Sequence, residues 1–137
     1  LFRLRRAWLA AKRGDYDRSA ALYDAEGRWP DEHADPLRSR VRSWALYRTA
    51  EARLLQGRAA EAERLLEKLD GLTLPKGVKD WALLRRGNAL DLRGNRAGAD
   101  RAYAAVEEKR AKALARQFRK TRFPAGPKDL MPFFTGY

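Results

Sequence analysis

Apolar side chains recur along this chain with the spacing of amphipathic helices. In residues 59–69 the apolar positions are Ala62, Leu65, Leu66 and Leu69, which share one face of a helix. The same periodicity predicts helices at about 1–13, 16–27, 36–56 and 78–93, and a last helix that we expect to run from 96 to 120. We find no convincing strand, so the pattern predicts an all-α chain.

One helical segment occurs twice. Residues 44–57 and 81–94 are identical at seven of fourteen positions and lie 37 residues apart, and residues 1–14 form a fainter third copy. Each copy ends in Gly and is followed by an Ala-rich helical stretch. A repeat of this kind predicts helical hairpins stacked on one another, because a single hairpin cannot bury its own apolar face.

Five positions recur in the three copies: Ala7, Ala10, Gly14, Ser19 and Tyr23 in the first, Ala50, Arg53, Gly57, Ala62 and Leu66 in the second, and Gly87, Leu90, Gly94, Ala99 and Tyr103 in the third. In these residues the hairpins resemble the tetratricopeptide repeat, a helix–turn–helix unit of 34 residues. That family has small residues where the two helices cross, a large residue beside them and Gly in the turn. The spacings of 37 and 43 residues are longer than the family's repeat, and the extra residues fall in two Pro-containing connectors.

The resemblance implies a right-handed α-α superhelix of three helix–turn–helix repeats. We expect the repeats at about 1–29, 36–70 and 78–107, followed by a long C-terminal capping helix to about 120. Together they form one predicted domain, residues 1–122. Residues 123–137 contain three prolines and two glycines, which predicts an irregular tail.

The resemblance also implies an inner groove lined by the first helix of each repeat, suited to a peptide with apolar anchors. Trp44 and Trp81 occupy equivalent positions, so they either pack against the preceding hairpin or face a ligand. Of the five positions with which one subfamily grips chaperone C-termini, only Arg85 matches, so we do not expect that partner. The predicted partner-binding groove consists of Trp8, Trp44, Tyr47, Glu51, Trp81, Leu84, Asn88 and Asp91.

The net charge of +12 is concentrated near the end of the chain. Residues 109–137 carry eight Lys or Arg and one acidic residue. An apolar stripe of Ala111, Leu114, Ala115 and Phe118 runs along the same segment, which favours a capping helix with its charges in water. The alternatives are binding to nucleic-acid phosphates or adhesion to an anionic membrane surface. The basic patch consists of Arg110, Lys112, Arg116, Arg119 and Lys120.

Catalytic chemistry has few candidates here. The chain has no Cys and a single His, His33, in a polar loop, so we predict no enzyme activity, no metal site and no cofactor. Charged residues interrupt every apolar run, which excludes a membrane span and predicts a soluble chain. The compartment stays open, with a cytoplasmic location as the favoured alternative.

The sequence therefore predicts a non-catalytic scaffold that binds a protein partner, acidic or with apolar anchors, as a module of a larger protein. A nucleic-acid-binding repeat that uses residues 109–128 is the alternative. In a third possibility Phe133 and Phe134 of the tail dock on a second copy of the chain rather than packing back on their own.

Overall fold

The part of the chain that the structure describes consists of helices joined by short turns. The computed structural model describes the backbone of residues 2–27, 36–70, 74 and 77–124, and within these ranges it contains seven helices and no strand. The prediction of an all-α chain is confirmed. The helices are α1 (Phe2–Lys12), α2 (Tyr16–Gly27), α3 (Pro36–Leu55), α4 (Ala59–Asp70), α5 (Val78–Leu92), α6 (Arg96–Ala104) and α7 (Lys109–Lys120).

The same tight turn joins α1 to α2, α3 to α4 and α5 to α6. Its glycine has a φ of 79° at Gly14, 77° at Gly57 and 80° at Gly94, a region in which a side chain is strained. In each turn the next residue donates its N–H to the carbonyl five residues earlier, with N···O distances of 3.0, 2.8 and 2.9 Å. This bond closes the end of a helix on a glycine. The repeat in the sequence is therefore also a repeat in backbone geometry.

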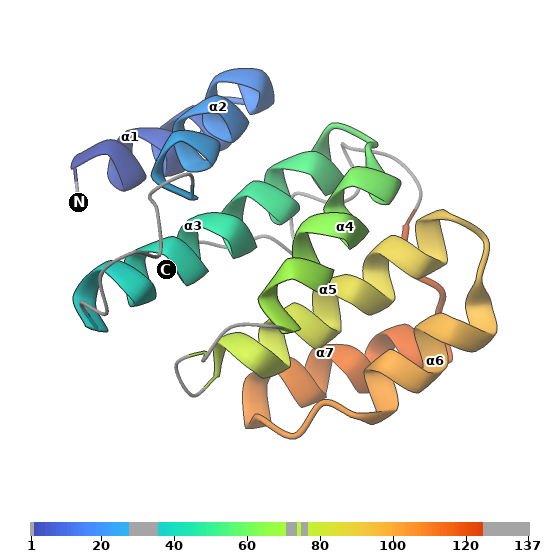
Figure 1. The fold of residues 1–137 in the computed structure, drawn as a ribbon. Coiled ribbons are helices and arrows are strands. Elements are labelled where there is room, and N and C mark those ends of the chain that lie inside the picture. Colours follow the sequence, from blue (N-terminus) through green and yellow to red (C-terminus); the bar gives the residue numbers. More distant parts are fainter. Residues whose placement is uncertain (1, 28–35, 71–73, 75–76, 125–137) are drawn as a thin grey trace.

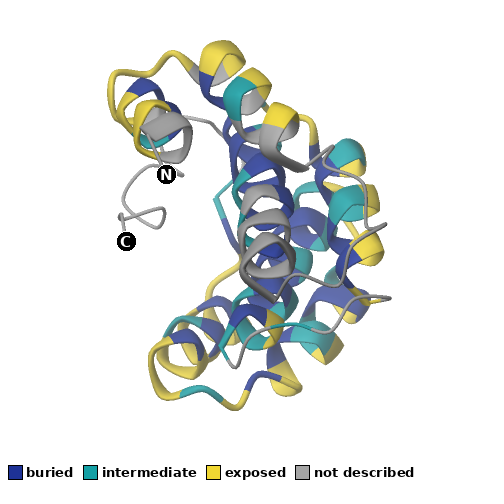
Figure 2. Ribbon diagram, turned by 60° about the vertical axis from the view of Figure 1, so that its left-hand side comes forward, coloured by how far each residue is buried: buried dark blue, intermediate teal, exposed yellow. Residues whose placement is uncertain are grey.

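Each helix packs against the one that follows it, and α3–α5 and α5–α7 are also in contact (Figure 1). Helix α5 thus touches α3, α4, α6 and α7 and lies at the centre of the arrangement. The ribbon is curved (Figure 2), with α1 and α2 at one end and α6 and α7 at the other (Figure 1). The largest apolar contribution to the core comes from α3 to α7, and includes Leu54, Leu66, Leu69, Leu84, Tyr103 and Phe118.

Helices α5 and α6 cross at Gly87. A Cβ atom built on Gly87 would lie 2.3 Å from Cε1 of the Tyr103 ring, so only a residue without a side chain fits here. The 37-residue spacing places Ala50 and Leu66 at the same two positions in the preceding repeat, and both are buried. In the preceding repeat, the smaller Leu66 on α4 thus stands in place of Tyr103, and the larger Ala50 on α3 stands in place of Gly87.

The predicted helix over 96–120 is wrong in one respect, because it is two helices. Helix α6 ends at Ala104, residues 105–108 turn, and α7 begins at Lys109. Glu108 is the N-cap of α7: its carboxylate accepts the N–H of Ala111 at 2.8 Å, and its own N–H donates to Asp80 on α5 at 2.9 Å. The break turns the chain back so that α7 packs against both α5 and α6.

The start of the predicted tail packs on the helices. Phe123 is 1 % exposed, and its ring meets the Phe118 ring edge to face with centroids 4.9 Å apart. Phe133 and Phe134 of the tail and the connector with His33 lie outside the described residues.

Candidate functional site

The predicted groove residues lie on three alternate helices. Trp8 is on α1, Trp44, Tyr47 and Glu51 are on α3, and the others are on α5. Their spacing of three or four residues gives each helix one continuous face. The structure divides the set by burial. The three tryptophans are half-buried, whereas the other five are buried, namely Tyr47, Glu51, Leu84, Asn88 and Asp91.

The buried polar residues of α3 and α5 bind one another. Glu51 lies at the junction: its Oε2 accepts the Tyr47 hydroxyl at 3.1 Å and Nε of Arg85 at 3.0 Å. Its other oxygen, Oε1, accepts Nη1 of Arg48 at 2.5 Å. One carboxylate thus receives donors from its own helix and from the helix one repeat further along.

From Arg85 the hydrogen bonds continue into α6. Nη1 of Arg85 donates to Asn88 at 3.1 Å, and the Asn88 amide donates to the Tyr103 hydroxyl at 3.0 Å. That hydroxyl in turn donates to Asp91 at 2.7 Å. Asn88 and Asp91 have no exposed surface, so their polar groups are satisfied by the chain itself.

The Asp91 carboxylate is the last group in this series, and it also binds residues near the end of the described part of the chain. It accepts two bonds from Arg96 at 2.8 and 2.9 Å and one from the Phe123 N–H at 3.2 Å. Arg96 also donates to the carbonyl oxygens of Phe118 and Arg119 in the last turn of α7. We call the connected set the polar chain; it consists of Tyr47, Arg48, Glu51, Arg85, Asn88, Tyr103, Asp91 and Arg96.

Burial and neighbouring charges fix the protonation of the polar chain. Burial raises the pKa of the Tyr47 hydroxyl well above its ordinary value, and the Glu51 carboxylate adds to this effect. Burial likewise raises the pKa of Tyr103, helped by the hydrogen bond to Asp91. Burial alone would lower the pKa of Arg85, but Tyr47 and Glu51 outweigh it and raise the pKa. Both phenols are therefore neutral and the guanidinium is charged at neutral pH.

The sequence repeat extends into these contacts. Arg48 and Arg85 are 37 residues apart, and each donates through Nη1 to the residue three positions later, Glu51 or Asn88. The sequence pattern placed Glu51, Asn88 and Asp91 on a groove, gave Tyr103 only a packing position in the third repeat, and indicated no role for Arg96. The available signal was the matched spacing of Arg48 and Arg85, which predicts equivalent surroundings for the two guanidinium groups.

The half-buried tryptophans each carry a cation over the ring, four residues later on the same helix. Arg48 lies 5.8 Å from the Trp44 ring centroid, Arg85 lies 5.6 Å from that of Trp81, and Lys12 lies 5.4 Å from that of Trp8. Such stacking is favourable and fixes the ring. Trp44 and Trp81 also pack against the core, so they combine packing with a remaining exposed edge.

The basic patch lies on α7. Ala111, Ala115 and Phe118 are buried, so the predicted apolar stripe faces the protein and Leu114 lies partly buried beside it. Arg119 pairs with Asp100 of α6 at 2.9 Å. All five residues of the patch are exposed, and in the described part of the chain the other four, Arg110, Lys112, Arg116 and Lys120, form no ion pair.

Among the described residues, no group of His, Asp and Glu is arranged to hold a metal ion. Over the same residues, every helix is too short or too polar to cross a membrane. Comparison with protein-family models, with curated proteins and with solved structures yields no match to this chain.

Proposed function

We propose that the chain is a non-catalytic interaction module that binds a segment of another protein. Its architecture in this proposal is a right-handed superhelix of three tetratricopeptide-like hairpins, with α7 as the cap. The recurrence of one turn at Gly14, Gly57 and Gly94 and the contacts of alternate helices α3, α5 and α7 support it.

The observation that carries the proposal is the series of half-buried tryptophans with stacked cations. An aromatic ring that is held by packing and by a cation loses little conformational entropy when a partner covers its exposed edge. Aromatic residues of this kind dominate binding energies at protein interfaces. The polar chain beneath Trp44 and Trp81 holds α3 and α5 in fixed register, which keeps the two rings in place.

The chemistry of the partner follows from the rings and the charge. An extended or helical segment with apolar side chains would cover Trp44 and Trp81, and acidic side chains would suit a chain with a net charge of +12. The charge would speed association more than it would tighten the complex.

The test is capture of a partner from source lysate on the immobilised chain, with nuclease and at raised salt. Trp44→Phe with Trp81→Phe keeps an aromatic ring in the core but shrinks the exposed edge, whereas changes to Tyr47 or Asn88 would disturb buried residues. The matched control reverses Arg110, Lys112 and Arg116 to Glu, which leaves Arg119 and its contacts intact. We expect the unaltered chain and the α7 variant to capture a defined protein, and the double tryptophan variant to fail to capture it.

Nucleic-acid binding is the second candidate, favoured by four exposed Lys and Arg side chains of α7 that form no ion pair with any described residue. It would use phosphate contacts and would weaken steeply as salt rises. A captured species that disappears with nuclease and with the α7 reversals, but survives the tryptophan changes, would replace the first proposal with this one.

A further inference from the structure

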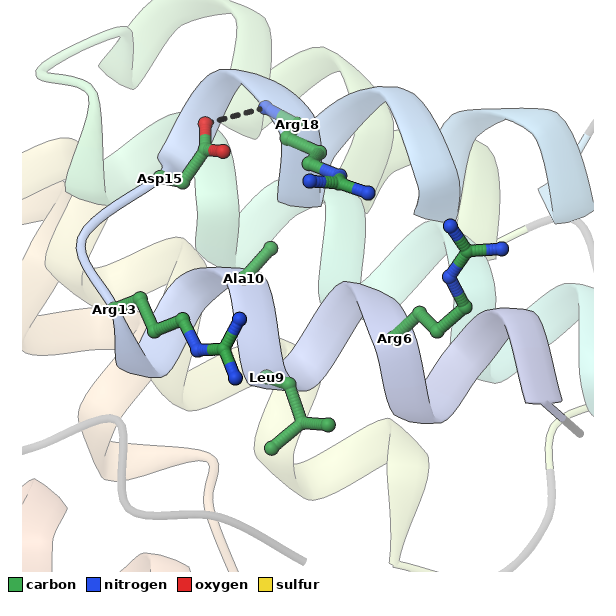
Figure 3. A pocket seen from close by; sticks show the side chains of 6 residues that line it. All are labelled: Arg6, Leu9, Ala10, Arg13, Asp15 and Arg18. Carbon is green, nitrogen blue, oxygen red and sulfur yellow. Dashed lines mark hydrogen bonds between the residues drawn. The ribbon is translucent and has the colours of Figure 1, made fainter.

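A small pocket between α1 and α2 is lined by three arginines. Its volume is about 130 Å³, and its walls are Arg6, Leu9, Ala10, Arg13, Asp15 and Arg18 (Figure 3). Arg6, Leu9 and Ala10 lie on neighbouring positions of α1, and Arg13 follows in the turn directly after the helix, three residues beyond Ala10. Arg18 projects from α2 on the opposite side, so two helices contribute the charge (Figure 3).

Among the described residues, the positive charge of the pocket is only partly offset. Across the described residues, the side chains of Arg6, Arg13 and Arg18 form no ion pair and no hydrogen bond. Asp15 is the single acidic wall residue, and its Oδ1 accepts the backbone N–H of Arg18 at 3.2 Å as the cap of α2. Three guanidinium groups against one carboxylate leave the pocket with a formal charge of +2.

The walls also include an apolar surface. Leu9 is 37 % exposed, and no other large hydrophobic side chain among the described residues is as exposed. Along the chain it lies between Arg6 on α1 and Arg13 in the turn, and its side chain points away from α2, so it forms the outer edge of the pocket (Figure 3). A ligand that fits these walls carries a compact anion for the arginines and a carbon group for Leu9.

We propose that this pocket binds an organic phosphate monoester. Such a group carries a charge of roughly −1.5 to −2 at neutral pH and several strong acceptor oxygens, which matches the +2 of the pocket better than a carboxylate does. Planar guanidinium groups bind phosphate oxygens through paired hydrogen bonds. Leu9 contacts the carbon-bearing part of the ligand. The face that holds Trp8 and Lys12 is on another side of α1, so this site is separate from the proposed partner surface.

The experiment titrates the whole chain with phenyl phosphate at constant ionic strength while the amide resonances of residues 6–18 are recorded by NMR. We expect saturable shifts confined to this region. Arg6→Gln, Arg13→Gln and Arg18→Gln should each weaken binding by roughly fivefold or more. Arg101→Gln, a matched loss of one exposed arginine on α6, should leave it unchanged. Shifts that spread over the molecule, or that persist in the three variants, would overturn the proposal.

Asp15→Asn provides a test that misfolding cannot imitate. Asn is as good a helix cap as Asp, so α2 keeps its first turn while the pocket loses its negative charge. We expect phenyl phosphate to bind more tightly to this variant, and unchanged or weaker binding would contradict an electrostatic site.

Two further ligands identify the chemistry. Acetate should bind much more weakly than phenyl phosphate, and equal affinity would contradict the match to a dianion. In the unaltered chain, inorganic phosphate should bind more weakly than phenyl phosphate. In Leu9→Ala the two ligands should bind with equal affinity. Equal binding of the two ligands to the unaltered chain would overturn the part of the proposal that assigns a monoester rather than free phosphate.

Discussion

Nε of Arg85 lies 3.0 Å from Oε2 of Glu51, although the two residues are 34 positions apart in the sequence. Their side chains are 2 % and 6 % exposed, so the ion pair is almost fully removed from water. It joins α3 to α5 at the point where two successive repeats meet. A buried pair of this kind is costly to break because the remaining charge stays in a poorly solvated site.

We expect Glu51→Ala to lower the free energy of unfolding by about 3–5 kcal/mol, because it removes the carboxylate that faces Arg85. Urea unfolding followed by circular dichroism measures the loss. The control is Glu61→Ala, which removes a half-exposed carboxylate paired with Arg53 and Arg58, and should cost at most about 1 kcal/mol. Equal losses in the two variants would show that the buried ion pair contributes no more to stability than the half-exposed one.

Gly87→Ala should destabilise the chain by about 1–3 kcal/mol, because its Cβ overlaps the Tyr103 ring. The repeat supplies a rescue: Ala50 and Leu66 are the equivalent residues of the preceding hairpin. Adding Tyr103→Leu to Gly87→Ala reproduces that pair, so Gly87→Ala should cost less in the Tyr103→Leu background than alone. A double-mutant cycle from thermal melts measures the difference, and simple additivity would refute the clash.

Glu108 should contribute to stability in a pH-dependent way. The backbone hydrogen bond from Ala111 lowers the pKa of its carboxyl below the ordinary 4.5. A lowered folded pKa means that the contribution is present above about pH 4.5 and is lost as the pH falls through the folded value. Glu108→Ala should cost about 1 kcal/mol at pH 7 and progressively less in acid. Urea midpoints from pH 7 to 3 test this.

The control for the cap is Glu107→Ala, an exposed neighbour that changes the net charge by the same amount. It should leave the stability at pH 7 within about 0.5 kcal/mol of the unaltered chain. A loss as large as that of Glu108→Ala would attribute the effect to charge rather than to the cap.

Tyr47 and Tyr103 should make the fold sensitive to alkali. Both pKa values are raised above the ordinary 10 by burial, so the neutral phenols stabilise the folded chain below pH 10. Above pH 10 the unfolded chain loses these protons first, and stability falls by up to about 1.4 kcal/mol per pH unit for each tyrosine. Tyr103→Phe should lower the stability at pH 8 yet reduce the slope above pH 10. An unchanged slope would place the Tyr103 pKa near its ordinary value.

Local pattern was sufficient to predict most of the helices. Gly14, Gly57 and Gly94 mark turns because each follows an apolar-periodic segment, and the structure places a positive φ at all three. The break between α6 and α7 was missed because residues 105–108 contain neither Gly nor Pro. It is stabilised by Asp80, 28 residues earlier, and a single-helix pattern carries no information on such a contact.

The polar residues of the candidate site show the same limit. Helical spacing placed Glu51, Asn88 and Asp91 on shared faces, but it could not distinguish a face that meets a partner from one that meets another helix. The deciding contacts join Glu51 to Arg85, Asn88 to Tyr103 and Asp91 to Phe123, across 34, 15 and 32 residues. That Trp44 and Trp81 contact a ligand stays a prediction, since core packing covers only part of each side chain.

Arg96 has a consequence for the motions of the chain. Its guanidinium binds Asp91 on α5 and the carbonyl oxygens of Phe118 and Arg119 at the end of α7, while its backbone begins α6. The terminal turn of α7 therefore cannot fray without breaking bonds to a helix in the core. Amide protons of residues 117–121 should exchange with solvent as slowly as those of α5, and the three helices should open as one cooperative unit rather than from the end inward.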